Sequence, residues 1–121
     1  MELQEQGNNL SGGQKQRLSI ARALLAQRDV YIFDEAASNI DAESEDAIVS
    51  VIYKLAETKM VIMITHRLKS IKGCDQIYVI DQGTCQEHGR HEELLRLRGT
   101  YARMYEKQQE LEAMEGAEQY A

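Results

Sequence analysis

Two short runs of β-forming residues place the strongest limit on how this chain can fold. Residues 29–33 read Asp-Val-Tyr-Ile-Phe, and residues 60–64 read Met-Val-Ile-Met-Ile. Neither run alternates apolar with polar residues, so each suits a strand that is buried on both faces of a parallel sheet. Polar residues follow directly, Asp34-Glu35 after the first run and Thr65-His66-Arg67 after the second. Open α/β sheets place their ligands at the C-terminal ends of strands, so these residues are candidates for a site.

Helical segments separate and follow the two predicted strands. A first helix is predicted to run to about Gln27, and a second begins after Asp41, which can cap it. Their expected core stripes are Leu18, Ala21, Leu24 and Leu25 in the first helix, and Ile48, Val49, Ile52 and Leu55 in the second. The order strand–helix–strand predicts an α/β fold with right-handed crossovers and a parallel sheet.

The remainder of the chain reads as a third strand, a small hairpin and helices. A strand is expected at residues 76–80, and Asp81-Gln82-Gly83 then predicts a turn into a short strand around residues 84–86. A helix begins near Glu92 and is stopped by Gly99. Another charged helix is expected to follow it.

Composition excludes several classes of function. At 121 residues the chain is one domain or part of one, and its net charge of -6 argues against sequence-independent nucleic-acid binding. No apolar run approaches the roughly 20 residues that cross a bilayer, and the polar N-terminus is no signal peptide. Cys74 and Cys85 lack partners at zinc spacing and are expected to be cytosolic thiols. His88 and His91 are expected to be surface residues, because no third metal ligand accompanies them.

The stretch from Asn9 to Arg17 predicts a loop that turns into a helix. Ser11 can act as N-cap, with Gln14 three residues later in a capping box. Gly12 and Gly13 leave the first backbone N–H groups bare, so a phosphate can approach the positive end of the helix dipole.

This stretch continues as Lys-Gln-Arg-Leu-Ser-Ile-Ala-Arg-Ala-Leu over residues 15–24, and the acidic pair follows after the next strand. The combination resembles the signature motif and Walker B region of ABC (ATP-binding cassette) ATPases. By this resemblance Asp34 is the Walker B aspartate that helps to hold Mg²⁺, and Glu35 is the catalytic glutamate. His66 matches the switch histidine, a donor to the γ-phosphate.

The resemblance extends from about residue 5 to residue 110. Ser38-Asn39-Ile40-Asp41 is similar to the D-loop, with Ile where the family usually has Leu, and Asp41 would meet the opposite subunit there. Ala37 stands where the family usually has Thr or another small residue. The resemblance implies that Ser11, Gly12, Gly13 and Gln14 bind the ATP of the opposite subunit in a head-to-tail dimer. Residues 87–105 are similar to the end of exporter-type cassettes.

The family's phosphate-binding motif is missing, because no G-x-x-x-x-G-K-[ST] loop occurs in these 121 residues. The family's adenine-stacking aromatic residue and its glutamine-bearing loop are absent as well. Residues 1–121 therefore resemble a partial nucleotide-binding domain, the C-terminal part of a P-loop NTPase (RecA-like) parallel sheet with flanking helices and no Walker A strand. In the family that strand lies between the strands at 60–64 and 76–80. We expect these two strands to pair directly, to take a strand from another chain, or to leave the chain partly ordered.

The implied function is that of a fragment of an ATP-hydrolysing domain that powers transport in an exporter-like ABC transporter. Its partners would be a second nucleotide-binding domain and transmembrane domains, which would hold it at the cytoplasmic side of a membrane. ATP and Mg²⁺ would bind only together with the missing half, so the chain is expected to be inactive alone. Two alternatives are a non-catalytic module that supplies a signature surface in trans, and an ABC ATPase of DNA repair or chromosome maintenance. The latter would need coiled-coil heptads, and none are visible.

Overall fold

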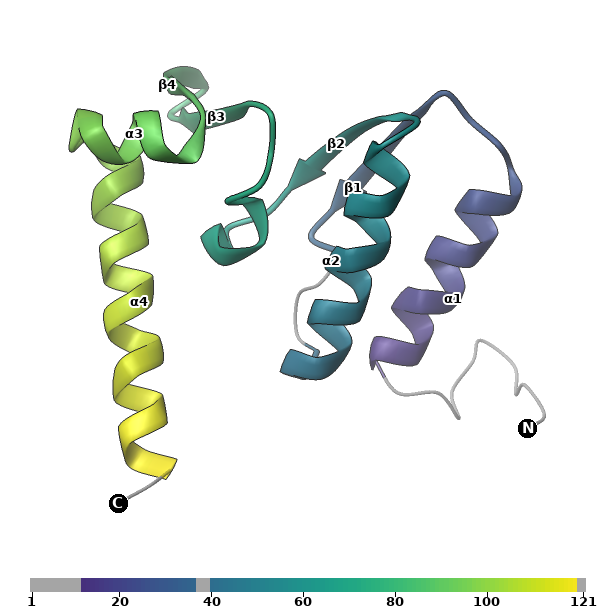
Figure 1. Ribbon diagram of the computed structural model, residues 1–121, viewed down its shortest axis with the longest axis horizontal. Helices are drawn as coiled ribbons and strands as arrows, with labels where there is room; N and C mark the ends of the chain where they lie inside the picture. The colour runs from purple at the N-terminus through teal and green to yellow at the C-terminus, as the bar shows by residue number, and fades with distance from the viewer. Residues whose placement is uncertain (1–11, 37–39, 120–121) are drawn as a thin grey trace. The chain divides into compact units, whose positions relative to one another are not determined.

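The computed structural model describes residues 12–36 and 40–119, in which helices and strands alternate (Figure 1). The chain divides into two compact units, Met1–His66 and Arg67–Ala121. The described elements of the first unit are α1 (Gly12–Leu25), β1 (Val30–Asp34), α2 (Ala42–Ala56) and β2 (Met60–Ile64). Those of the second are the 3₁₀ helix η2 (Leu68–Ile71), β3 (Ile77–Asp81), β4 (Thr84–Gly89), α3 (His91–Leu97) and α4 (Thr100–Gln119). The predicted α/β class is confirmed.

The first unit is built on a parallel pair of strands. β1 and β2 pair in parallel with Val30 opposite Met60 and Asp34 opposite Ile64. The N–H of Met60 donates to the carbonyl of Asp29 at 3.1 Å, which fixes the start of this register. Since α2 connects the two strands, the predicted strand–helix–strand order with parallel pairing is confirmed for this unit.

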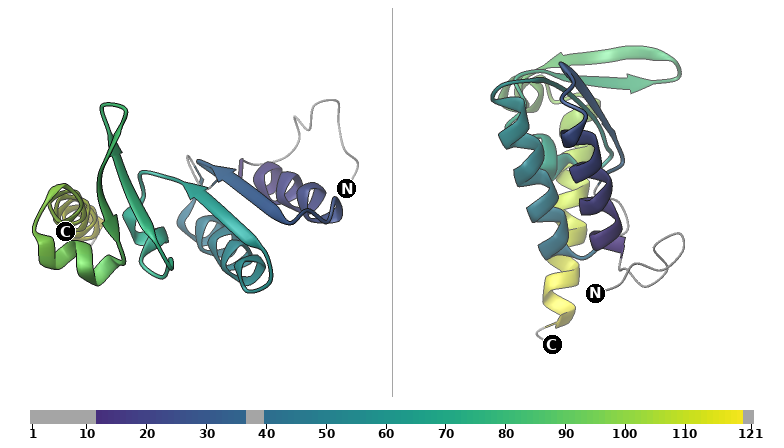
Figure 2. Two further views of the ribbon diagram at one scale, coloured as in Figure 1. Left: turned by 90° about the horizontal axis from the view of Figure 1, so that it is seen from above. Right: turned by 90° about the vertical axis from the view of Figure 1, so that its right-hand side faces the viewer.

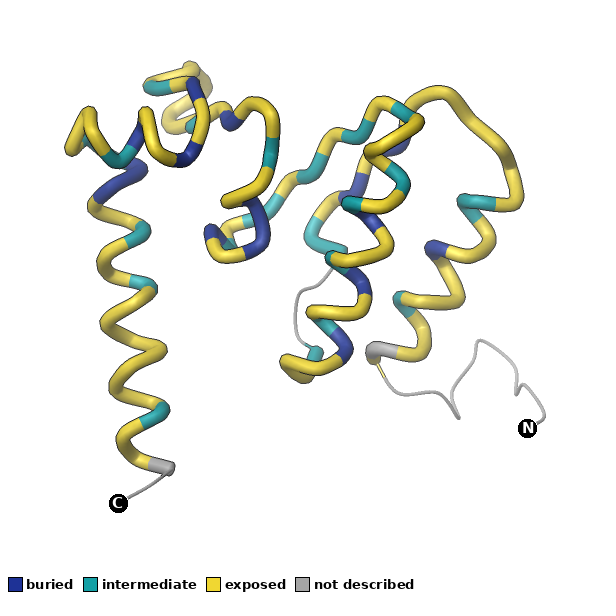
Figure 3. The backbone as a smooth tube through the Cα atoms, in the orientation of Figure 1, coloured by how far each residue is buried: buried dark blue, intermediate teal, exposed yellow. Residues whose placement is uncertain are grey.

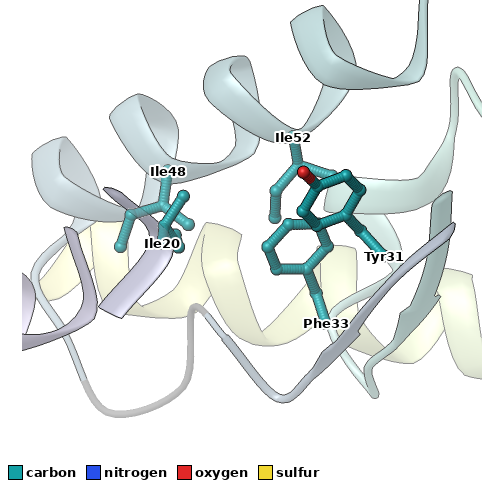
Figure 4. Close-up of a cluster of buried hydrophobic side chains, with 5 residues drawn as sticks. All are labelled: Ile20, Tyr31, Phe33, Ile48 and Ile52. Atoms are coloured by element: carbon teal, nitrogen blue, oxygen red, sulfur yellow. The ribbon is translucent and has the colours of Figure 1, made fainter. Parts of the chain in front are cut away.

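The core of the first unit lies between the sheet and two helices. α1 and α2 lie side by side on one face of the β1–β2 pair (Figures 1 and 2). The core cluster consists of Ile20, Tyr31, Phe33, Ile48 and Ile52 (Figure 4). Ile48 is completely buried, and full burial of such a side chain contributes about 1.5–3 kcal/mol.

The opposite face of this sheet carries apolar, exposed side chains, so the expectation of strands buried on both faces is wrong for the described residues. Figure 3 shows how exposed and less exposed positions alternate along β1 and β2. Side chains alternate along each strand, and the helices cover only the face that carries Tyr31 and Phe33. The exposed large side chains on the other face are Val30, Ile32, Met60, Ile62 and Ile64, with exposed fractions of 46–64%.

α1 turns a different face to the core than its sequence predicts. Ile20 is buried and Leu24 is half-buried against the core, whereas Leu18, Ala21 and Leu25 are exposed. The predicted stripe is therefore wrong except for Leu24. Ile20 and Leu24 are four residues apart on one helix face, and packing against β1 and α2 decides which apolar face is buried.

The second unit begins with η2 and a hairpin. β3 and β4 pair antiparallel, with Ile77 opposite Gly89 and Asp81 opposite Thr84. Gln82 and Gly83 have φ values of 49° and 76°, as a two-residue type I′ turn requires. The predicted turn is thus confirmed, and β4 extends beyond the predicted end at residue 86. Within the described residues, the hydrogen-bonded strand pairs are β1–β2 in the first unit and β3–β4 in the second.

A carboxylate on β4 holds the beginning of α4. Glu87 accepts hydrogen bonds from the N–H of Thr100 at 2.6 Å and from the N–H of Tyr101 at 3.2 Å. These donors belong to the first turn of α4, where no intrahelical acceptor exists. Gly99 makes room for the contact, because a Cβ at this position would lie 2.9 Å from the carboxyl carbon of Glu87.

His91 is buried, so its prediction as a surface residue is wrong. Its Nδ1 lies 2.8 Å from the hydroxyl of Tyr101, and its ring contacts Tyr105 edge-on with 4.8 Å between centroids. Tyr101 is almost completely buried, and this desolvation raises the pKa of its hydroxyl to about 12. His88 is exposed as predicted. The helix α3 is therefore fixed to α4 through an imidazole–phenol contact.

None of the helices in residues 12–36 and 40–119 combines the length and apolar character that a bilayer crossing requires.

Candidate functional site

The C-terminal ends of β1 and β2 bring together the polar residues predicted there. β1 ends at Asp34 and β2 at Ile64, directly opposite each other in the parallel register. One further hydrogen bond extends the pairing, from the N–H of Glu35 to the carbonyl of Ile64 at 2.8 Å. The next residues of both strands are thereby held at the same edge of the sheet.

Glu35 and His66 are in contact at this edge. The Nδ1 atom of His66 lies 3.1 Å from Oε1 of Glu35, although 31 residues separate them in the chain. The side chains remain accessible, with exposed fractions of 70% for His66 and 39% for Glu35. A carboxylate and an imidazole in hydrogen-bond contact can orient a water molecule and exchange a proton with it.

Glu35 has a backbone conformation that sequence reasoning did not find. Its φ is 54°, in the left-handed region that non-glycine residues seldom adopt and that is enriched at functional sites. Nothing in the sequence announces this, because glutamate has no special preference for the left-handed region. The conformation follows the last paired residue of β1.

Asp34 is the other carboxylate at the end of β1, and its side chain is exposed. Mg²⁺ prefers oxygen ligands and commonly uses one or two carboxylates together with phosphate oxygens of a substrate. The carboxylate of Asp34 fits that requirement chemically. Within residues 12–36 and 40–119 no three His, Cys, Asp or Glu side chains gather as a metal site.

Asp41 caps α2, as its position in the sequence predicts. Its Oδ2 accepts a hydrogen bond from the N–H of Ser44 at 3.0 Å. The hydroxyl and N–H of Ser44 both bind this carboxylate and hold the pKa of Asp41 below its usual value. Residues 37–39 lie outside the described residues, so the predicted D-loop is described only at Ile40 and Asp41.

The predicted phosphate-binding turn lies at the start of α1. Gly12, Gly13 and Gln14 form its first turn, whereas Ser11 lies outside the described residues. The first N–H groups of an α-helix have no intrahelical acceptor and carry the positive end of the helix dipole. This terminus can therefore receive an anion.

Comparison with known proteins finds similarity to ATP-binding proteins of ABC transporters. A sequence profile of the family described as ABC transporter matches residues 1–38. An uncharacterized ABC transporter ATP-binding protein of Haemophilus influenzae is 50% identical over 112 residues, which are 93% of this chain and 20% of that protein. The ATP-dependent lipid A-core flippase of Haemophilus ducreyi is 50% identical over 104 residues, 86% of this chain and 18% of the flippase.

A solved structure agrees with these sequence matches. A bacterial Atm1-family ABC exporter with ATP bound superimposes with a TM-score of 0.78 and 42% identity, covering 89% of this chain and 19% of the exporter. The 121-residue chain thus spans about a fifth of the length of the proteins that it resembles.

Proposed function

This chain is a homologue of the ATP-binding domains of ABC transporters, and we propose that it forms the C-terminal part of such a domain in an exporter. The complete domain would hydrolyse ATP to power transport across a membrane. The observation that supports this most directly is the Glu35–His66 contact at the ends of two parallel strands. The solved structure named as an exporter supports the direction of transport.

Glu35 would act on the attacking water. Its carboxylate is accessible, and the hydrogen bond to Nδ1 of His66 orients it. A carboxylate in this position can accept a proton from water or hold the water in line for attack on a phosphoryl group.

His66 would serve the phosphate that is transferred. If Nδ1–H donates to Glu35, a neutral imidazole leaves Nε2 as an acceptor only. His66 can then donate to a phosphate in two ways. It can carry a second proton, or it can exchange its contact with Glu35 for one with the phosphate.

The remaining site residues would act around the nucleotide. Asp34 would hold Mg²⁺, which supplies positive charge to the phosphates when it is bound. Ser11, Gly12, Gly13 and Gln14 would bind the ATP of a second, head-to-tail nucleotide-binding domain, and Asp41 would position the D-loop facing that domain. Transmembrane domains would connect the complex to the membrane from its cytoplasmic side.

A chimera tests this function. Residues 1–121 replace the matching segment of the flippase from Haemophilus ducreyi. The flippase keeps all of its other residues, including the upstream part of its ATP-binding domain. The chimera should hydrolyse ATP, and Glu35→Gln should slow turnover by at least ~100-fold with little loss of ATP binding, since it removes the basic carboxylate but keeps the size.

Glu110→Gln is the matched control, because Glu110 is an exposed carboxylate on α4 and its loss should leave turnover unchanged. A chimera that folds and binds ATP but turns it over equally fast with Gln at position 35 would remove Glu35 from the reaction. A folded chimera without any hydrolysis would instead favour the non-catalytic interaction module.

A further inference from the structure

The helix α1 carries the proposed phosphate-binding turn at one end and joins β1 at the other. It begins at Gly12 and ends at Leu25, and residues 26–29 connect it to the strand. Ile20 and Leu24 pack the helix against the core of the first unit. Apolar packing is non-directional, so the orientation of α1 also depends on how its last turn is joined to β1.

The hydroxyl of Tyr31, on β1, binds this connection. The N–H of Arg28 donates to the Tyr31 oxygen at 3.0 Å. Directly before it, Gln27 has a φ of 48°, in the left-handed region that non-glycine residues seldom adopt and that neighbouring contacts must hold. The N–H of Gln27 donates to the carbonyl of Leu24 at 3.2 Å. Two consecutive N–H groups therefore link the connection to the end of α1 on one side and to β1 on the other.

The ring of Tyr31 is fixed in the core, so its hydroxyl is a well-positioned acceptor. Tyr31 is only 6% exposed, and its ring is nearly parallel to that of Phe33 with 6.4 Å between the centroids. Figure 4 shows the Tyr31 ring next to Ile52 of α2. A buried tyrosine hydroxyl usually has a hydrogen-bond partner, and here that partner is the backbone of the connection.

We propose that the Tyr31 hydroxyl is a positioning group, which sets the direction of α1 relative to β1. It thereby sets the place of the turn that begins at Gly12. The helix has 14 residues, and a helix of that length extends about 20 Å. A tilt of about 5° at its C-terminal end would displace its N-terminal turn by about 2 Å. The catalytic consequence rests on the proposed function, in which this turn binds the ATP of the opposite subunit.

Tyr31→Phe removes the hydroxyl and keeps the ring. The contacts with Phe33 and Ile52 remain, so the core should stay folded. Arg28 is exposed, and its N–H can then bind water. Gln27 loses the hydrogen bond that follows its left-handed backbone. We therefore expect α1 to take up a wider range of tilts in this variant.

Distances between two spin labels test the direction of α1 in the 121-residue chain. The labels are attached at Lys15→Cys on α1 and Asp46→Cys on α2, two exposed positions, in a Cys74→Ser, Cys85→Ser background. Tyr31→Phe should shift or broaden the distance distribution by at least ~2 Å, the displacement expected for a small tilt. An unchanged distribution would overturn the proposal.

Tyr105→Phe is the matched control, because it also removes a phenol hydroxyl that accepts a hydrogen bond. The Tyr105 oxygen accepts from Nε2 of Gln109 at 2.9 Å, within α4 of the second unit. This control should leave the distance distribution unchanged. An equal change in both variants would mean that the labels report general loosening, and it would remove the positioning role from Tyr31.

Kinetics of the chimera described above test the catalytic consequence. Tyr31→Phe should lower kcat by at least ~5-fold, because a misplacement of about 1 Å can cost about 100-fold in rate. The KM for ATP should change by less than ~2-fold, since most phosphate contacts come from the Walker A half. Tyr105→Phe should leave both constants unchanged.

The outcomes separate this role from a purely structural one and from the proposed function. A role in stability alone would reduce the amount of folded protein but leave kcat per folded molecule unchanged, and that result would overturn the catalytic part of the proposal. A chimera without any ATP hydrolysis would count against the proposed function. The spin-label distances would then still decide whether Tyr31 positions α1.

Discussion

His66 Nδ1 and Glu35 Oε1 lie 3.1 Å apart because each residue follows a strand of the same parallel pair. The register brings Asp34 opposite Ile64, and the Glu35 N–H to Ile64 carbonyl bond extends it by one residue. The pairing of β1 with β2 therefore brings the two side chains together.

This contact predicts the tautomer of His66. We expect the neutral imidazole to carry its proton on Nδ1, because an ionised Glu35 can only accept. Long-range ¹H–¹⁵N NMR distinguishes the two tautomers. Glu35→Ala should shift the population toward the Nε2–H form, and a dominant Nε2–H tautomer in the unaltered chain would contradict the geometry.

The 121-residue chain alone should bind Mg-ATP weakly, with no micromolar affinity in titration calorimetry. Most phosphate contacts in P-loop NTPases come from the Walker A backbone and its lysine, and the sequence contains no such motif. One helix N-terminus is a weak substitute for that loop. Micromolar binding that persists in a Gly12→Ala, Gly13→Ala variant would mean that a different site holds the nucleotide.

Asp41 should stabilise the first unit above its titration range and less below it. Ser44 lowers the pKa of Asp41 in the folded state, so the unfolded state binds the proton more tightly. The contribution is present above the ordinary value of 3.8 and is lost as the pH falls below it. Melting temperatures between pH 2 and pH 6 should show less pH dependence in Asp41→Asn, which keeps the cap. Asp41→Ala should melt at a lower temperature at neutral pH.

Gly99→Ala should lower the free energy of unfolding by about 1–3 kcal/mol, as overpacking typically does. The new methyl group would collide with the Glu87 carboxylate that holds the start of α4. Gly116→Ala, inside α4, is the control, because nothing lies within 4 Å of a Cβ at that position. It should raise stability by about 0.5–1 kcal/mol. Denaturant titrations of both variants measure the difference, and equal effects would rule out the collision.

Tyr101 should make the second unit sensitive to alkaline pH. Its pKa is raised to about 12 in the folded state from the ordinary value of 10.0. The folded state therefore keeps a proton that the unfolded state releases, and stability falls as the pH rises from 10 towards 12. Absorbance at 295 nm should show one tyrosine that ionises late, and this component should vanish in Tyr101→Phe. Ionisation of every tyrosine near pH 10 would contradict the burial.

The sequence predicts the elements and the meeting of the site residues more reliably than it predicts burial. β2 has the expected bounds, and polar residues after two parallel strands necessarily share a sheet edge. The apolar character of the strands alone could not show that the sheet face carrying Ile32 and Ile62 is exposed. The conformational preference of glutamate also gave no indication that the backbone of Glu35 is left-handed.

Long-range packing decided the other differences. Ile20 rather than Leu18 faces the core, because both helix faces carry apolar residues and only tertiary contact selects between them. His91 is buried because Tyr101, ten residues later, supplies a hydrogen-bond partner. A histidine near polar neighbours in sequence gives no indication of such a partner.

The hydrogen bond from the Glu35 N–H to the Ile64 carbonyl also ties the Glu35–His66 contact to the alignment of β1 and β2. If β2 slid along β1 by a single residue, about 3.3 Å, His66 would lose hydrogen-bond contact with Glu35. The distance from the imidazole of His66 to the carboxylate of Glu35 therefore depends directly on the alignment of β2 with β1. The imidazole ¹⁵N chemical shifts of His66 would change if β2 slid along β1.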